Sequence, residues 1–160
     1  DMAALLSQLH EQAEELSLGR HTLVFEAEPG LKLEGAVANL ESAFRNLIFN
    51  AIHYTPEGGR ITVQWKNSAN GPCFSVTDTG IGIPQRHIPR LTERFYRVSP
   101  DRSRQSGGTG LGLAIVKHVL NAHDAQLQIK SELGEGSVFT CQFPPPGEPS
   151  PLPELQLRPL

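Results

Sequence analysis

The run Gly107–Gly112 ("GGTGLG") places four glycines at the head of a predicted helix, although glycine is a poor helix former. Such a run can be a plain flexible loop. It can also bring backbone N–H groups close to an anion, because the N-terminus of a helix favours phosphate binding. Thr109 would add a hydroxyl donor. The run lacks the Lys-Ser/Thr pair of a P-loop and the spacing of a dinucleotide fingerprint, so by itself it leaves both readings open.

Two amides share one face of another predicted helix, because Asn46 and Asn50 are spaced i, i+4. Ser42, His53 and Tyr54 lie on or beside that face, and the apolar stripe points elsewhere. An amide oxygen can bind Mg²⁺ without adding negative charge to a site that also holds phosphates. The alternative is a solvated helix face, where two asparagines cost little.

A carboxylate and two glycines follow a predicted strand in "DTGIGIP". Asp78, held at the strand end, could accept a hydrogen bond from an exocyclic amine. Gly80 and Gly82 would let the backbone approach a flat ring, which a Cβ would block. The alternative is an ordinary strand exit, where aspartate and glycine are favoured turn residues.

Positive charge precedes the glycine run, in Arg97, Arg102 and Arg104. These side chains could reach phosphate groups, or they could simply be solvated. The six histidines and two cysteines show no zinc-type spacing, so we expect none of the histidines to bind a metal. We expect the cysteines to be reduced thiols and not a disulfide.

Composition excludes several classes of protein. The chain has 160 residues, 38% of them hydrophobic, and a net charge of −3, which is typical of one globular domain without a basic nucleic-acid-binding field. It contains no apolar run long enough to span a bilayer and no signal peptide. Because the sequence begins at Asp1, it reads like a fragment, and a membrane-anchored parent protein is compatible with it.

Hydrophobic periodicity predicts an α+β fold in two layers. The predicted helices are Asp1–Leu18, Leu40–Tyr54 and Leu111–Asn121, with a short helix near His87–Arg97. The predicted strands are "TLVFEA", "ITVQWK", "CFSVTD", "LQIKSE" and "SVFTCQF", with a somewhat long first hairpin loop at Asn70-Gly71 and a second hairpin around Gly134–Gly136. Residues 144–160 are rich in proline, and we expect a disordered tail.

Four segments in order resemble a known family: "NLIFNAIHYTP" its N box, "DTGIGIP" and "GGTGLGLAIVKH" its two glycine boxes, and "ERFYRV" its F box. The family is the catalytic, ATP-binding domain of sensor histidine kinases, within the GHKL ATPases that include type II topoisomerases, Hsp90 and MutL. The resemblance spans residues 1–143. It implies a Bergerat-type two-layer sandwich, with a mixed sheet of about five strands against three helices and a flexible ATP lid. The runs "HIPRLTERFYRV" and "SRQSGGTGLGLAIVKH" look closest to the phosphate-regulon branch.

The resemblance also implies roles for individual residues. Asn50 matches the Mg²⁺ ligand. Asn46 stands where the ATPase relatives carry a glutamate base, and an amide there favours transfer over hydrolysis. Arg97 would reach the phosphates from the lid, so Asn46 and Arg97 are the implied catalytic residues. Asp78 matches the adenine-recognising aspartate and Tyr54 an aromatic that packs on adenine. His53 stands where many members carry lysine or arginine. The implied nucleotide-binding set is Asn46, Asn50, His53, Tyr54, Asp78, Gly80, Gly82, Ile83, Arg97, Arg102, Arg104, Gly108, Thr109, Gly110, Leu111 and Gly112.

The cofactors implied are ATP and Mg²⁺, under a lid from Pro89 to Gly108. The family's acceptor histidine lies in a separate dimerising hairpin, and His10-Glu11 does not match its motif. We therefore expect a monomeric fragment that is the cytoplasmic domain of a bacterial inner-membrane homodimer. Its expected partners are the dimerisation and histidine-phosphotransfer domain of the same kinase and a PhoB-like response regulator, with no nucleic acid. The alternatives are an ATP hydrolase or clamp of the wider family, and a nucleotide-responsive docking module.

Overall fold

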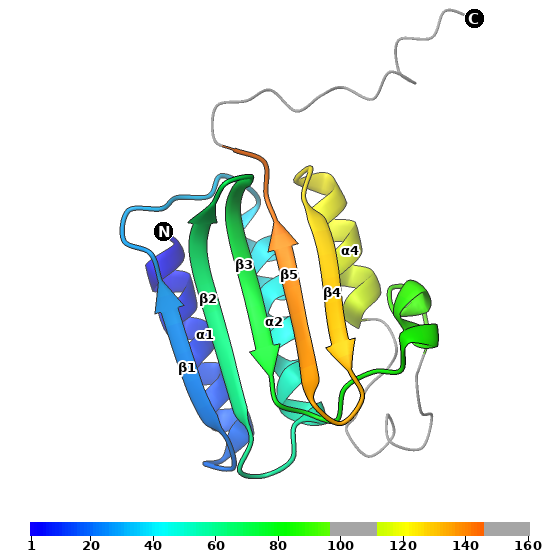
Figure 1. The fold of residues 1–160 in the computed structure, drawn as a ribbon. Coiled ribbons are helices and arrows are strands. Elements are labelled where there is room, and N and C mark those ends of the chain that lie inside the picture. The colour runs from blue at the N-terminus through cyan, green and yellow to red at the C-terminus, as the bar shows by residue number, and fades with distance from the viewer. Residues whose placement is uncertain (97–111, 146–160) are drawn as a thin grey trace, which may run out of the picture.

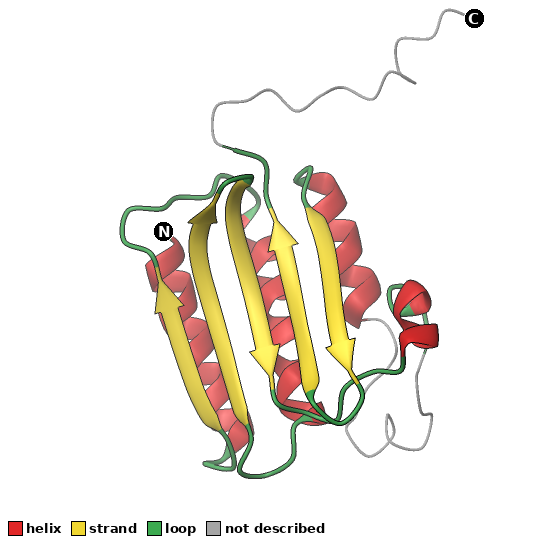
Figure 2. Ribbon diagram, viewed as in Figure 1, coloured by secondary structure: helices red, strands yellow, loops and turns green. Residues whose placement is uncertain are grey.

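One mixed sheet organises the computed structural model, which describes residues 1–96 and 112–145 (Figure 1). Its strand order is β1-β2-β3-β5-β4, with β1 and β2 parallel and the other neighbours antiparallel. The strands are β1 (Thr22–Ala27), β2 (Arg60–Ser68), β3 (Gly71–Asp78), β4 (Gln126–Glu132) and β5 (Gly136–Gln142). Helices α1 (Met2–Ser17), α2 (Val37–Tyr54) and α4 (Gly112–Ala122) cover one face of the sheet (Figure 2). The predicted two-layer fold is confirmed.

The core lies between this sheet and the helices. Side chains along β2 alternate between the two faces of the sheet, and those on the covered face, Ile61, Val63 and Trp65, are buried. Phe44 of α2 stacks on Phe74 of β3 with ring centroids 4.0 Å apart. Aromatic pairs of this kind add specific geometry to apolar burial, and so they fix α2 over the middle of the sheet.

The two cysteines point to opposite faces of the sheet. Cys73 is paired across the β3–β5 ladder with Gln142, whereas the fully buried Cys141 is paired with Phe74 on the core side. Both thiols are free, which confirms the expectation of reduced cysteines. Burial raises the pKa of the Cys141 thiol, so this cysteine behaves as an inert core residue.

Helix α2 begins at Val37, three residues before the predicted start at Leu40. Its N-cap residue, Ala36, offers no side-chain acceptor. Instead, the Ala36 amide donates to Nε2 of His123 at 3.1 Å, and Nδ1 of His123 lies 2.8 Å from the carbonyl oxygen of Val119 near the end of α4. This contact ties the start of α2 to the end of α4, while the free amides of the first turn of α2 have no side-chain cap.

Two other local predictions were wrong. The short helix expected at His87–Arg97 is a 3₁₀ helix, η1, at Gln85–Arg90, since Pro89 removes a backbone donor and only a brief helical turn forms. The loop between β2 and β3 has only residues 69–70, because β2 extends to Ser68. Among the described residues, no helix is long and apolar enough to cross a membrane.

Candidate nucleotide-binding site

The described residues of the predicted site lie toward one end of the molecule. The C-terminal end of α2, the end of β3 and the start of β5 lie together at the lower end in Figure 1, and α4 begins above them, against the middle of α2. This arrangement brings the asparagine face of α2, Asp78 and Gly112 to a common region, although they are far apart in sequence.

Asp78 is held at the end of β3 and is 8% exposed. Its Oδ1 accepts hydrogen bonds from the backbone amides of Gly80 at 2.9 Å and Ser137 at 3.2 Å. Burial raises the pKa of the Asp78 carboxyl, and these two hydrogen bonds oppose that shift. A partly desolvated acceptor in a fixed orientation is well suited to recognising a single amine donor.

The glycines after Asp78 are required by the packing of the protein itself. A Cβ on Gly80 would lie 2.5 Å from the carbonyl oxygen of Tyr54. Gly82 has φ +74°, and a Cβ there would lie 2.0 Å from the carbonyl oxygen of Glu132. Any side chain at either position would push the loop away from α2 or from the β4–β5 hairpin.

A buried serine pair, absent from our predictions, ties this loop to the sheet. Ser131 Oγ accepts from the amide of Ile83 at 2.7 Å and donates to the carbonyl oxygen of Gly136 at 3.0 Å. The Ser137 hydroxyl lies 2.8 Å from Ser131 Oγ, and the Ser137 amide holds Asp78. The one available signal was the occurrence of serine at core-facing positions of two strands, where a polar side chain needs partners.

Asn46 faces the first turn of α4. Its Nδ2 donates to the carbonyl oxygen of Ser42 at 2.8 Å, which fixes the amide plane. Its Oδ1 would lie 3.0 Å from a Cβ on Gly112. Asn50 lies one turn further along α2 and is half-buried, so both amides are on the same side of the helix, as their spacing predicts.

The end of α2 carries the two remaining predicted contacts. Tyr54 is half-buried, and its carbonyl oxygen accepts from the Ile81 amide at 3.2 Å. His53 is exposed, yet desolvation and the positive charge of Arg20 lower the pKa of its imidazole. At neutral pH His53 is therefore uncharged, which weakens it as a partner for phosphate.

The start of the predicted lid is packed against η1 as far as the structure describes it. Leu91 is buried, the Tyr96 hydroxyl hydrogen-bonds Nδ1 of His87, and the Arg90 guanidinium lies over the Tyr96 ring at 4.5 Å from its centroid. The other predicted site residues lie outside the described ranges, namely Arg97, Arg102, Arg104, Gly108, Thr109, Gly110 and Leu111.

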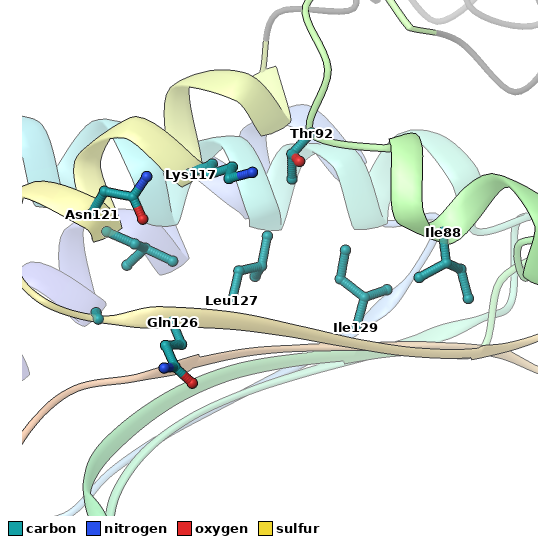
Figure 3. Close-up of a pocket in the computed structure, with 9 residues that line it drawn as sticks. Ile88, Thr92, Lys117, Asn121, Gln126, Leu127 and Ile129 are labelled. Carbon is teal, nitrogen blue, oxygen red and sulfur yellow. The ribbon is translucent and has the colours of Figure 1, made fainter.

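A separate hollow of about 370 Å³ lies between α4, η1 and β4 (Figure 3). Leu127 and Ile129 of β4 form its floor, with Lys117 of α4 and Thr92 at its rim. None of the predicted site residues lines it, so it is distinct from the region around Asp78.

The amide oxygens on α2 are of the ligand type that Mg²⁺ accepts. Across residues 1–96 and 112–145 there is no group of three or more His, Cys, Asp or Glu side chains that could hold a metal ion. Mg²⁺ needs few protein ligands when substrate phosphates supply the rest, and an amide oxygen such as that of Asn50 fits this role.

Residues 35–147 match the family model described as "Histidine kinase-, DNA gyrase B-, and HSP90-like ATPase", so the chain belongs to this family of ATP-binding domains. Among its relatives, the phosphate regulon sensor protein PhoR of Pseudomonas aeruginosa is 53% identical over 143 residues, covering 89% of this chain and 32% of PhoR. The chain therefore spans about a third of the length of this curated relative.

Solved structures agree with this assignment. The mycobacterial sensor histidine kinase MprB has a TM-score of 0.78 and 27% identity, over 90% of this chain and 95% of that one. Full-length ShkA in complex with AMPPNP has a TM-score of 0.77 and 28% identity, over 90% of this chain and 30% of that one. The fold is thus that of histidine kinase catalytic domains.

Proposed function

We propose that this chain is the catalytic domain of a sensor histidine kinase, which transfers the γ-phosphoryl group of ATP to a histidine on a separate dimerisation domain. The observation that carries the proposal is the placement of Asn46. Its neutral amide faces the start of α4 and is fixed by Ser42, at the position where a hydrolase of this family would carry a basic glutamate. An amide cannot activate water as a general base, which favours transfer over hydrolysis.

The site residues would act mainly by positioning, as is usual in phosphoryl transfer. Asp78 would accept the exocyclic amine of adenine and so fix the nucleotide, while Tyr54 packs beside the base. Asn50 would hold Mg²⁺, which supplies positive charge to the phosphate oxygens. The first turn of α4 would direct its free amides at the phosphates. In the reaction an imidazole nitrogen attacks the γ-phosphorus, a P–N bond forms, and the bond to the bridging oxygen breaks to release ADP.

The finer assignment rests on the relatives. The 53% identity to PhoR favours a role in phosphate-starvation signalling and a PhoB-like response regulator. By the same reasoning, the parent kinase would be a membrane-anchored homodimer, with residues 1–143 as its ATP-binding domain and 144–160 as a tail.

The test provides a histidine-containing domain as the acceptor of the phosphoryl group. The chain is mixed with a separately produced dimerisation hairpin of the P. aeruginosa relative, radiolabelled ATP and Mg²⁺. We expect acid-labile, base-stable phosphohistidine on the hairpin and little free phosphate. Steady phosphate release without labelling of the hairpin would instead indicate a hydrolase.

Asn50→Ala sharpens the test of the metal role. We expect it to weaken Mg²⁺-dependent binding of a non-hydrolysable ATP analogue more than metal-free binding. Asn39→Ala, an exposed amide in the first turn of the same helix, is the matched control and should leave both unchanged. Equal losses with and without Mg²⁺ would show that Asn50 is structural.

A further inference from the structure

Thr55, the C-cap residue that follows α2, buries a hydroxyl without a partner. The side chain is 4% exposed, and Oγ1 is the one enclosed side-chain polar atom of the described residues that makes no hydrogen bond. An orphan hydroxyl of this kind destabilises a folded protein, since it has lost water and gained nothing in return. A native protein that keeps one calls for an explanation, and a functional role of the hydroxyl is one such explanation.

The orientation of Thr55 is specific. Its methyl group, Cγ2, faces Gly59, where a Cβ would lie only 2.2 Å away. Its hydroxyl faces the opposite way, toward Gly80, where a Cβ would lie 3.0 Å from Oγ1. The backbone is anchored as well, because Nε2 of His21 lies 2.6 Å from the Thr55 carbonyl oxygen. The hydroxyl is therefore held on the side of Asp78.

Three oxygens converge where Gly80 lacks a side chain. The carbonyl oxygen of Tyr54, Asp78 Oδ1 and Thr55 Oγ1 lie 2.5, 2.9 and 3.0 Å from that point. The first accepts from Ile81, and the second accepts from Gly80 and Ser137. Of the three, only the threonine hydroxyl carries a proton to donate, and this proton is unused.

We propose that the Thr55 hydroxyl is a specificity-determining group of the nucleotide site, which donates a hydrogen bond to a ring nitrogen of the bound adenine, directly or through one water. This inference rests on the proposed function. Adenine presents an amine donor beside a ring-nitrogen acceptor, and the pair Asp78 carboxylate and Thr55 hydroxyl is complementary to that pattern. Guanine presents a carbonyl and an N–H at the same edge, so the same pair disfavours it.

Engagement needs only a local movement. Oγ1 is enclosed, and Gly80, at the start of the loop that follows Asp78, lies against it. A small displacement of this loop, or a rotation of the Thr55 side chain about χ1, would expose the hydroxyl to the base.

The test uses Thr55→Val, which keeps the shape and removes the hydroxyl, and Thr55→Ser, which keeps the hydroxyl. Thr77→Val, on the open face of β3 next to Asp78, is the matched control. Binding of a non-hydrolysable ATP analogue and of the GTP analogue is measured by calorimetry, and the unfolding midpoint is measured without nucleotide.

We expect Thr55→Val to bind the ATP analogue about tenfold more weakly, with weak GTP-analogue binding unchanged and an unfolding midpoint equal to or above that of the wild type. Thr55→Ser and Thr77→Val should bind within about twofold of the wild type. Unchanged ATP affinity in Thr55→Val would overturn the proposal. A lowered unfolding midpoint, or a Thr55→Val chain that does not fold, would also overturn it, because the hydroxyl would then stabilise the folded protein. If the wild type itself bound no ATP analogue, the proposed function would fail, and this inference with it.

Discussion

Gly112 lies against Asn46 so closely that a Cβ at position 112 would be 3.0 Å from Asn46 Oδ1. The absence of a side chain on the first residue of α4 thus allows this helix to approach α2 at its amide face. The same contact joins the segment that resembles the N box to the one that resembles the second glycine box. It explains why position 112 is a glycine, although most other residues would favour the helix more.

Replacing Gly112 with alanine should weaken nucleotide binding without lowering the stability of the fold. Alanine favours the helical backbone, so we expect the unfolding midpoint to stay or to rise. The added methyl crowds Asn46 Oδ1, so we expect affinity for Mg²⁺ and a non-hydrolysable ATP analogue to fall about threefold to tenfold. Calorimetric titration and thermal denaturation of the same sample check both effects. Full affinity in Gly112→Ala would show that the contact relaxes without consequence.

Asp78→Asn should stabilise the nucleotide-free protein at neutral pH while it abolishes adenine recognition. Burial raises the pKa of Asp78, so keeping this carboxylate ionised at pH 7 costs stability. Below the pKa of Asp78 in the unfolded chain, the carboxyl is neutral in both the folded and the unfolded protein. As the pH rises from there through the higher pKa of the folded protein, the free energy of unfolding decreases. The asparagine keeps the acceptor for Gly80 and Ser137.

Thermal melts of Asp78→Asn and the wild type from pH 3 to 8 provide the check. The advantage of the variant should be largest near neutrality and vanish at the acid end. A variant that melts below the wild type at pH 7 would mean that the carboxylate is stabilised by its two amide donors more than it is penalised by burial.

His53→Lys should strengthen nucleotide binding. Because desolvation and Arg20 lower the pKa of His53, this side chain carries no charge at neutral pH. A lysine would place a permanent charge at the end of α2, which we expect to raise ATP affinity up to about fivefold. The gain should shrink in high salt, and wild-type binding should itself tighten when the pH is lowered through the depressed pKa of His53. An affinity gain that salt leaves untouched would argue against a charge effect.

Ala36→Asp should stabilise the fold. Ala36 is the N-cap residue of α2 and gives no side-chain hydrogen bond to the free amides of the first turn. Aspartate at this position would cap them, for a gain of about 1 kcal/mol in the free energy of unfolding measured in urea. Ala36→Leu, which has no acceptor, is the control and should give no gain. If both variants behaved alike, an acceptor at position 36 would contribute nothing to the stability of the helix start.

Sequence periodicity predicted the helices and strands because each is amphipathic over its own length, as in Phe44 of α2 and Trp65 of β2. It failed at η1, where Pro89 makes a short turn without a stripe. The sequence also predicted the position of Asp78 at the end of a strand, which the structure confirms, whereas its role in binding stays a prediction. Ser131 and His123 were missed because their significance lies in partners that the chain brings together only after folding, and Thr55 because its burial without a partner is visible only in the folded chain.

The place of β5 in the sheet has a consequence for the order of assembly during synthesis. This last strand lies between β3 and β4 and not at an edge, so until it has left the ribosome β3 has an unpaired side and Asp78 lacks the Ser137 amide. The strands β1, β2 and β3 precede β5 in the chain and pair with one another without it, whereas the orientation of Asp78 depends on β5. The hydrogen bond from Ser137 to Asp78 thus forms only after the last of these five strands has been made.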